Sequence, residues 1–169
     1  MSWNTKRSLS CVPYVLFRIY FALIFSFLAH DAYGEVSNGE FAVGLNTPGV
    51  GARYFLSDRF SLEAKVQYQT DVSVFGFREY FYLNPGARKL NFLLGLENSF
   101  VSFKADNADG KGFFGEFYLG GEYFLTRRFS FQLDVGPGYV YLSDDSTKLT
   151  EKGLEFVANF GLNWYFGKP

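Results

Sequence analysis

The sequence predicts an all-β fold, an eight-stranded antiparallel up-and-down transmembrane β-barrel preceded by a cleavable signal helix. Three observations lead to this prediction. Strand-forming residues dominate the chain, which holds 22 Phe and 12 Tyr among its 169 residues. Apolar and polar residues alternate with a period of two in run after run, and turn-forming residues separate the runs. The apolar face of these runs is strongly aromatic, whereas the opposite face is built of small and charged residues.

Residues 1–34 show the order of segments that is typical of a secretory signal peptide. Basic residues come first, and they are Lys6, Arg7 and Arg18. The uncharged apolar run that follows, 19–29, is shorter than the roughly 20 residues that a membrane-spanning helix needs. Ala32 and Gly34 then occupy the small-residue positions before a predicted cut after Gly34. A retained signal anchor over 12–29 is the alternative interpretation.

Residues 35–169 are predicted to form one barrel domain, and its first four strands are short. These strands are expected at 39–46, 50–57, 60–70 and 74–83. The breaks between them read TPGVG, SDR and TDV, which are turn-forming or short charged sequences. The third strand, FSLEAKVQYQ, alternates without interruption. In the fourth strand Glu79 falls on the same face as Phe77 and Phe81, and a β-bulge or a position near the barrel rim would accommodate it.

The last four strands are expected to be longer. They are predicted at 89–101, 113–125, 129–142 and 152–166. The breaks around them read NPGAR, KADNADGKG, TRR and SDDSTKLTE. Pro137 has no N–H to donate to a neighbouring strand, so we expect a local distortion in the seventh strand. The eighth strand alternates most regularly, with Phe160, Leu162 and Trp164 on one face.

Two hairpins of the chain resemble each other in sequence. Gly51 to Val66 reads GARYFLSDRFSLEAKV, and Gly120 to Val135 reads GGEYFLTRRFSFQLDV. Both consist of a strand, a tight charged turn and a strand. Convergence on one hairpin architecture is the favoured explanation, and duplication of a hairpin is the alternative. In either case, both turns are expected at the same end of the barrel.

The apolar face of the predicted barrel is expected to point outward, toward lipid. A soluble, lipocalin-like barrel would instead turn this face inward. Repeated aromatic side chains on every strand would overfill the interior of an eight-stranded barrel, whereas the small residues of the other face fit it. Aromatic residues also gather toward strand ends, as they do in the belts of membrane barrels.

The inward face then carries a set of charged residues. They are Arg53, Glu63, Lys65, Arg78, Glu97, Glu116, Glu122, Asp134 and Glu155. Buried charges must be paired or hydrogen-bonded, and the excess of acids requires carboxyl groups that are protonated, hydrated or share one cation. A packed network of salt bridges that seals the lumen is the favoured interpretation. A narrow ion pathway and a catalytic pair of carboxylates are the alternatives.

The end of the chain resembles a known assembly signal. Residues 159–166, NFGLNWYF, follow the pattern polar–x–Gly–x–x–aromatic–x–aromatic through Asn159, Gly161, Trp164 and Phe166. This pattern resembles the C-terminal signal by which the barrel-assembly machinery recognises bacterial outer-membrane barrels. The mature chain as a whole resembles the small eight-stranded outer-membrane barrels, such as the OmpA transmembrane domain and the OmpX/Ail and OmpW-like proteins, with no subfamily assigned.

This resemblance implies a monomeric barrel in the bacterial outer membrane, with both termini in the periplasm. Its expected partners are outer-membrane lipid, lipopolysaccharide and, during biogenesis, the barrel-assembly machinery. Loops 104–112 and 144–151 would then be external and could bind a surface ligand.

No pattern in the chain indicates catalysis, a cofactor or a metal site. Barrels of this size that modify lipid A rely, as families, on a His, and both His30 and Cys11 lie in the predicted signal peptide. A net charge of −1 gives no indication of nucleic-acid binding. We therefore expect a structural, surface-interaction or minor-pore role. The alternatives are a secreted barrel that binds a hydrophobic ligand and, third, a lipid A-modifying enzyme.

Overall fold

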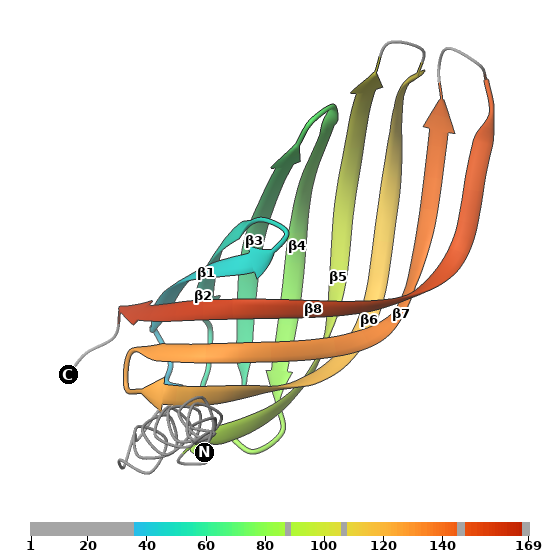
Figure 1. The fold of residues 1–169 in the computed structure, drawn as a ribbon. Coiled ribbons are helices and arrows are strands. Elements are labelled where there is room, and N and C mark those ends of the chain that lie inside the picture. The colour runs from blue at the N-terminus through green and yellow to red at the C-terminus, as the bar shows by residue number, and fades with distance from the viewer. Residues whose placement is uncertain (1–35, 87–88, 106–107, 145–147, 167–169) are drawn as a thin grey trace, which may run out of the picture. The chain divides into compact units, whose positions relative to one another are not determined.

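The computed structural model describes residues 36–86, 89–105, 108–144 and 148–166, and these form a closed antiparallel barrel (Figure 1). Consecutive strands are neighbours throughout, and the first strand pairs with the last. The strands are β1 Phe41–Thr47, β2 Val50–Phe55, β3 Phe60–Gln69, β4 Val72–Tyr82, β5 Leu90–Ala105, β6 Ala108–Thr126, β7 Phe129–Asp144 and β8 Thr150–Phe166. The all-β, eight-stranded prediction is therefore confirmed.

The predicted signal peptide, 1–34, lies outside the described residues, together with its cleavage positions Ala32 and Gly34. Within the described residues, no helix has the length and apolar character to cross a membrane.

The hairpins β5–β6 and β7–β8 are longer than the sequence predicts. The expected loop over 104–112 is mostly strand, because β5 continues to Ala105 and β6 begins at Ala108. Gly110 and Gly112 suggested a loop in the sequence, but they are strand residues. The side chains of Phe103 and Leu142 occupy the space that a Cβ at these two glycines would need. The expected loop over 144–151 is shortened in the same way, since β7 ends at Asp144 and β8 begins at Thr150.

The barrel wall formed by β1 and β2 is much shorter than the wall formed by β5 to β8. The hairpin β1–β2 turns at Pro48 and Gly49, and β1 pairs with β8 only from Phe160 to Phe166. Residues 150–159 of β8 pair with β7 alone among the described strands. Figure 1 shows the result, in which β5 to β8 rise well beyond the short first hairpin.

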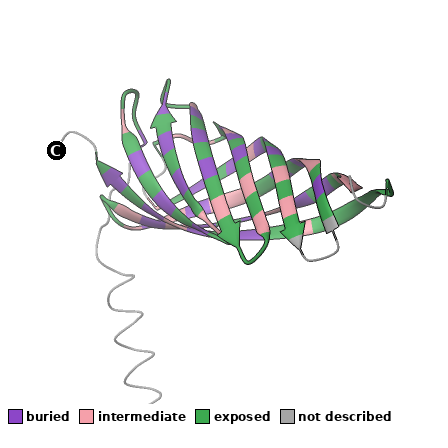
Figure 2. Ribbon diagram, turned by 90° about the horizontal axis from the view of Figure 1, so that it is seen from above, coloured by how far each residue is buried: buried purple, intermediate pink, exposed green. Residues whose placement is uncertain are grey.

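The interior of the barrel is polar and its outer face is apolar. Among the described residues, buried polar or charged residues outnumber buried hydrophobic ones by 16 to nine. Large hydrophobic side chains such as Leu133 and Phe156 are instead 53% and 76% exposed. Figure 2 shows this inversion as bands of buried and exposed residues that alternate along each strand.

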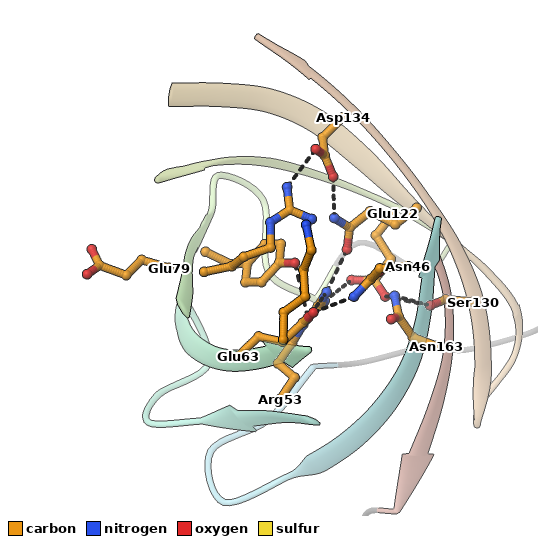
Figure 3. A network of polar contacts seen from close by, with 12 residues as sticks. Asn46, Arg53, Glu63, Glu79, Glu122, Ser130, Asp134 and Asn163 are labelled. Carbon is orange, nitrogen blue, oxygen red and sulfur yellow. Dashed lines mark hydrogen bonds and ion pairs between the residues drawn. The ribbon is translucent and has the colours of Figure 1, made fainter. Parts of the chain in front are cut away.

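Of the two strand irregularities expected from the sequence, the one at Pro137 is present and the β-bulge at Glu79 is not. No register shift interrupts the pairing of β4 with β3 or β5, so the β-bulge considered for Glu79 is absent from these described strands. Glu79 points outward three residues before β4 ends, and Figure 3 shows its side chain directed away from the interior. The expected distortion at Pro137 is present, because the β6–β7 ladder has no pairs at Pro137 and Gly136.

Candidate functional site: the charged network in the barrel

The structure gathers eight of the nine predicted inward charges in the interior of the barrel. They are Arg53, Glu63, Lys65, Arg78, Glu97, Glu116, Glu122 and Asp134, and each is 6% exposed or less. The alternation of each strand directs these side chains to one common space. Glu155 does not join them, because its segment of β8 extends above the short first hairpin and the residue is exposed.

Arg53 lies at the centre of the network and uses all three of its guanidinium nitrogens. Nε donates to Glu63 Oε2 at 2.9 Å, and Nη2 donates to Gln132 Oε1 at 2.8 Å. Nη1 donates to the Tyr82 hydroxyl at 2.9 Å and lies 3.4 Å from Glu122 Oε2. The planar guanidinium group therefore contacts four different side chains, and these contacts fix its position in the lumen.

The Glu122 carboxylate is surrounded by neutral donors in addition to Arg53. A buried carboxylate is costly unless hydrogen bonds replace its water shell. The side chains that donate to Glu122 are the hydroxyls of Tyr82, Ser130 and Tyr165 and the amide of Asn163. Figure 3 shows Ser130 and Asn163 approaching from one side of this cluster. The neutral donors explain how the lumen holds more acids than bases.

A second cluster is built around Arg78 and Glu97. Arg78 Nη2 donates to Asp134 Oδ1 at 2.7 Å, and Arg78 Nε lies 3.1 Å from Glu97 Oε2, although not in hydrogen-bond geometry. Lys65 Nζ donates to both oxygens of Glu97, at 2.9 and 3.1 Å. The Ser99 hydroxyl donates to the same carboxylate at 2.7 Å. Glu97 is therefore shared by two cations.

Gln132 and Tyr80 join the two clusters. The Gln132 side chain accepts from Arg53 through Oε1 and donates to Asp134 through Nε2 at 2.6 Å. The Tyr80 ring lies between the two guanidinium groups, 3.8 Å from Arg53 Cζ and 5.2 Å from Arg78 Cζ. The polar contacts consequently form one continuous network across the lumen (Figure 3).

The Asn159 amide joins the remaining carboxylate to the network. Its Nδ2 lies 3.1 Å from Glu116 Oε2 and 3.0 Å from Asp134 Oδ1. Asn159 is also the polar position of the predicted assembly signal. Of the other positions of that signal, Gly161 is buried on the inward face, whereas Trp164 and Phe166 are 52% and 58% exposed on the outer face.

Several uncharged residues of the network are not among the candidate site residues that the sequence indicates. They are Asn46, Tyr80, Tyr82, Ser99, Ser130, Gln132, Asn163 and Tyr165. Alternation places each of them at an inward position on its strand, but it does not show which of them contact the charged side chains.

The two similar hairpins meet in this network. Gln132 and Glu122 occupy the positions in the second hairpin that Glu63 and Arg53 occupy in the first, in each case 69 residues further on. Both turns lie at the same end of the barrel, as expected. Arg53 contacts its cross-strand partner Glu63 and both of the opposite equivalents, Glu122 and Gln132.

Aromatic rings close the lumen below the network, at the end where β2, β4, β6 and β8 approach their turns or end. The ring of Phe55 lies 5.6 Å from that of Tyr82 and 6.0 Å from that of Tyr165. The ring of Phe124 lies 5.1 Å from that of Tyr165. All four side chains are at most 1% exposed, so they form a packed floor.

Among the described residues, no group of three or more His, Cys, Asp or Glu side chains is arranged to hold a metal ion. His30 and Cys11 lie outside the described residues.

Comparison with known proteins supports the fold. No protein-family model and no curated protein match the sequence. The crystal structure of the N-terminal β-barrel domain of Pseudomonas aeruginosa OprF is similar to this structure, with a TM-score of 0.51 and 17% sequence identity. The match covers 75% of this chain and 94% of that one. The expected resemblance to small OmpA-like barrels is thereby confirmed for the fold, with no subfamily assigned.

Proposed function

We propose that this protein is an integral outer-membrane β-barrel with a sealed lumen and a structural, non-catalytic role in the cell envelope. In this proposal the signal peptide directs export, the barrel-assembly machinery inserts the chain, and the barrel is monomeric.

The distribution of polarity supports the membrane location. Lipid offers no partner for unpaired backbone groups, so only helices and closed barrels cross it, and this chain forms a closed barrel. The polar interior and apolar exterior match a transmembrane barrel and are the reverse of a water-soluble, lipocalin-like barrel.

The continuous network above an aromatic floor is the observation that carries the structural role. Arg53, Arg78 and their partners extend across the lumen, and their side chains contact one another in a continuous series. An ion pathway would require these contacts to separate. A surface-interaction role through the ends of the hairpins β5–β6 and β7–β8 is compatible with the same sealed barrel.

Two measurements test the proposal. The expressed protein should sediment with the outer membrane, resist extraction by alkaline carbonate and migrate differently on SDS gels before and after boiling. Recovery of the folded protein from the periplasm without detergent would contradict the membrane location. In planar bilayers the purified barrel should give no conductance steps, and regular open-channel steps of the unmodified protein would contradict the sealed lumen.

The absence of catalysis can be tested in the same cells. Lipid A extracted from expressing and non-expressing cells should have the same acylation pattern by mass spectrometry. An acyl chain removed or added only in expressing cells would support the enzyme alternative.

A further inference from the structure

A groove of about 860 Å³ lies on the outer face of the barrel, in the half that carries the β1–β2 turn. It crosses β3, β4, β5 and β6, and its lining includes Gly49 in that turn and Val50 at the start of β2. The groove is on the outer face because outward residues such as Tyr68, Ser73 and Phe75 line it.

Two parallel rows of paired residues form the walls of the groove. The wall nearer the periplasmic turns is apolar and consists of Val66, Phe75 and Phe100, which are paired in register across β3, β4 and β5. The opposite wall is polar. It consists of Tyr68, Ser73, Ser102 and Lys111, again paired in register. The hollow arises because two small serines stand between the long side chains of Tyr68 and Lys111.

Among the described residues that line the groove, the one ionised side chain is a lysine. By strand alternation, the outward ionised side chains in this half of the described strands are three lysines and one aspartate, and the exposed Asp71 lies in the turn between β3 and β4. The strand residues are Lys104, Lys111, Lys152 and Asp109, of which Lys104 and Asp109 are paired in register. Of these, Lys111 lines the groove itself. Such a site is complementary to an anion.

The depth of the groove matches a lipid boundary. Ser73 lies ten residues along the chain from Leu83, which follows the last residue of β4. At about 3.3 Å per residue and a strand tilt of about 40°, this separation corresponds to about 25 Å across the membrane. The apolar band of an outer-membrane barrel is also about 25 Å tall. The polar wall of the groove therefore falls at the level of lipid headgroups, and its apolar wall falls at the start of the acyl chains.

We propose that this groove binds a phosphorylated lipid of the outer leaflet. An acyl chain lies against Val66, Phe75 and Phe100, and the phosphate contacts Lys111, with the Ser102 hydroxyl as a neighbouring donor. The proposal rests on the membrane location proposed above. A free phosphate would use only the polar wall and would leave the apolar wall unoccupied, so the two walls together favour a lipid.

The test is native mass spectrometry of the purified barrel in mild detergent, titrated with a phosphorylated glycolipid from lipopolysaccharide. The unmodified barrel is expected to bind one lipid. Lys111→Gln should weaken binding at least tenfold by removing the cation, and Ser102→Phe should do so by filling the hollow. Lys148→Gln is the matched control for charge and Ala158→Phe for size, because both residues lie outside the groove lining and Ala158 pairs with Val135, which is not a groove residue. Both controls should bind as the unmodified barrel does.

Three outcomes would overturn the proposal. They are equal binding by Lys111→Gln, equal binding of the same lipid after its phosphates are removed, and displacement of the lipid by an equal concentration of inorganic phosphate. Heat-modifiable migration on SDS gels shows whether each variant is a folded barrel, so it distinguishes failure of the lipid site from failure of the proposed membrane barrel. A variant that retains the folded barrel in the outer membrane but binds lipid unchanged contradicts only the groove, whereas a barrel that is absent from the membrane contradicts both.

Discussion

At the scale of single residues, the barrel depends on one guanidinium that several acceptors share. We expect Arg53→Gln to destabilise the folded barrel by about 3–5 kcal/mol, because Glu63 and Glu122 would remain buried without their cation. Urea unfolding of the barrel refolded in lipid would measure this loss. Arg59→Gln, in the exposed turn after β2, is the control and should change the free energy of unfolding by less than about 0.5 kcal/mol. Equal values for the two variants would contradict the central role of Arg53.

A glycine beneath Tyr118 provides a second test at this scale. A Cβ at Gly95 would lie 2.0 Å from the Glu79 carbonyl oxygen and 2.5 Å from the Tyr118 hydroxyl, which donates to that carbonyl at 2.8 Å. Gly95→Ala should therefore destabilise the barrel by about 1–3 kcal/mol through overpacking. Gly153→Ala serves as the control, since a Cβ there meets no atom within 4 Å. Unfolding midpoints of the two variants, measured side by side, should differ clearly.

The positions of the charges could be predicted from the sequence, whereas their partners could not. Alternation alone directs Arg53 and Glu122 inward. Their contact across 69 residues depends on how strands on opposite sides of the closed barrel are staggered. The same stagger brings Asn163 to Glu122, so the polar residues that solvate the excess acids emerge only from the structure.

At the scale of the strands, the outward face of β7 tests the lipid contact. Leu133 is 53% exposed and lies opposite Gly121 and Phe160. If lipid surrounds this face, Leu133→Arg should destabilise the barrel by about 2–4 kcal/mol, because hydrocarbon offers the charge no partner. Thr150→Arg, at the exposed start of β8, is the control with an expected cost of about 0–1 kcal/mol. Unfolding in lipid vesicles gives both values, and an equal cost would place Leu133 outside the hydrocarbon.

The strand count and the outward face were predictable because alternation persists through most of the chain. The ends of the long hairpins were not, since Gly110 and Gly112 have the composition of a loop. Their role is set by packing, because small inward residues leave room for Phe103 and Leu142 on neighbouring strands. Composition alone does not distinguish a glycine in a turn from one beneath a large neighbour.

At the scale of the whole molecule, the two similar hairpins form opposite walls of one polar core. We expect the charge exchange Arg53→Glu with Glu122→Arg to recover at least about 1 kcal/mol of what Arg53→Glu alone loses, because an arginine at either position faces the same lumen. Recovery should be incomplete, since Tyr82 and Tyr165 donate specifically toward position 122. A double-mutant cycle of unfolding free energies measures the coupling. A coupling energy of zero would show that the two positions act independently.

The short first hairpin has a consequence for how the barrel forms and opens. Only the seven residues of β1 close the ring against β8, whereas β7 and β8 are 16 and 17 residues long. We infer that this seam closes last during insertion, because it joins the first and last strands of the chain, whereas every other seam joins strands that are consecutive in sequence. Hydrogen–deuterium exchange should then be faster for the amides of β1 than for those of β6, and equal protection would contradict this order.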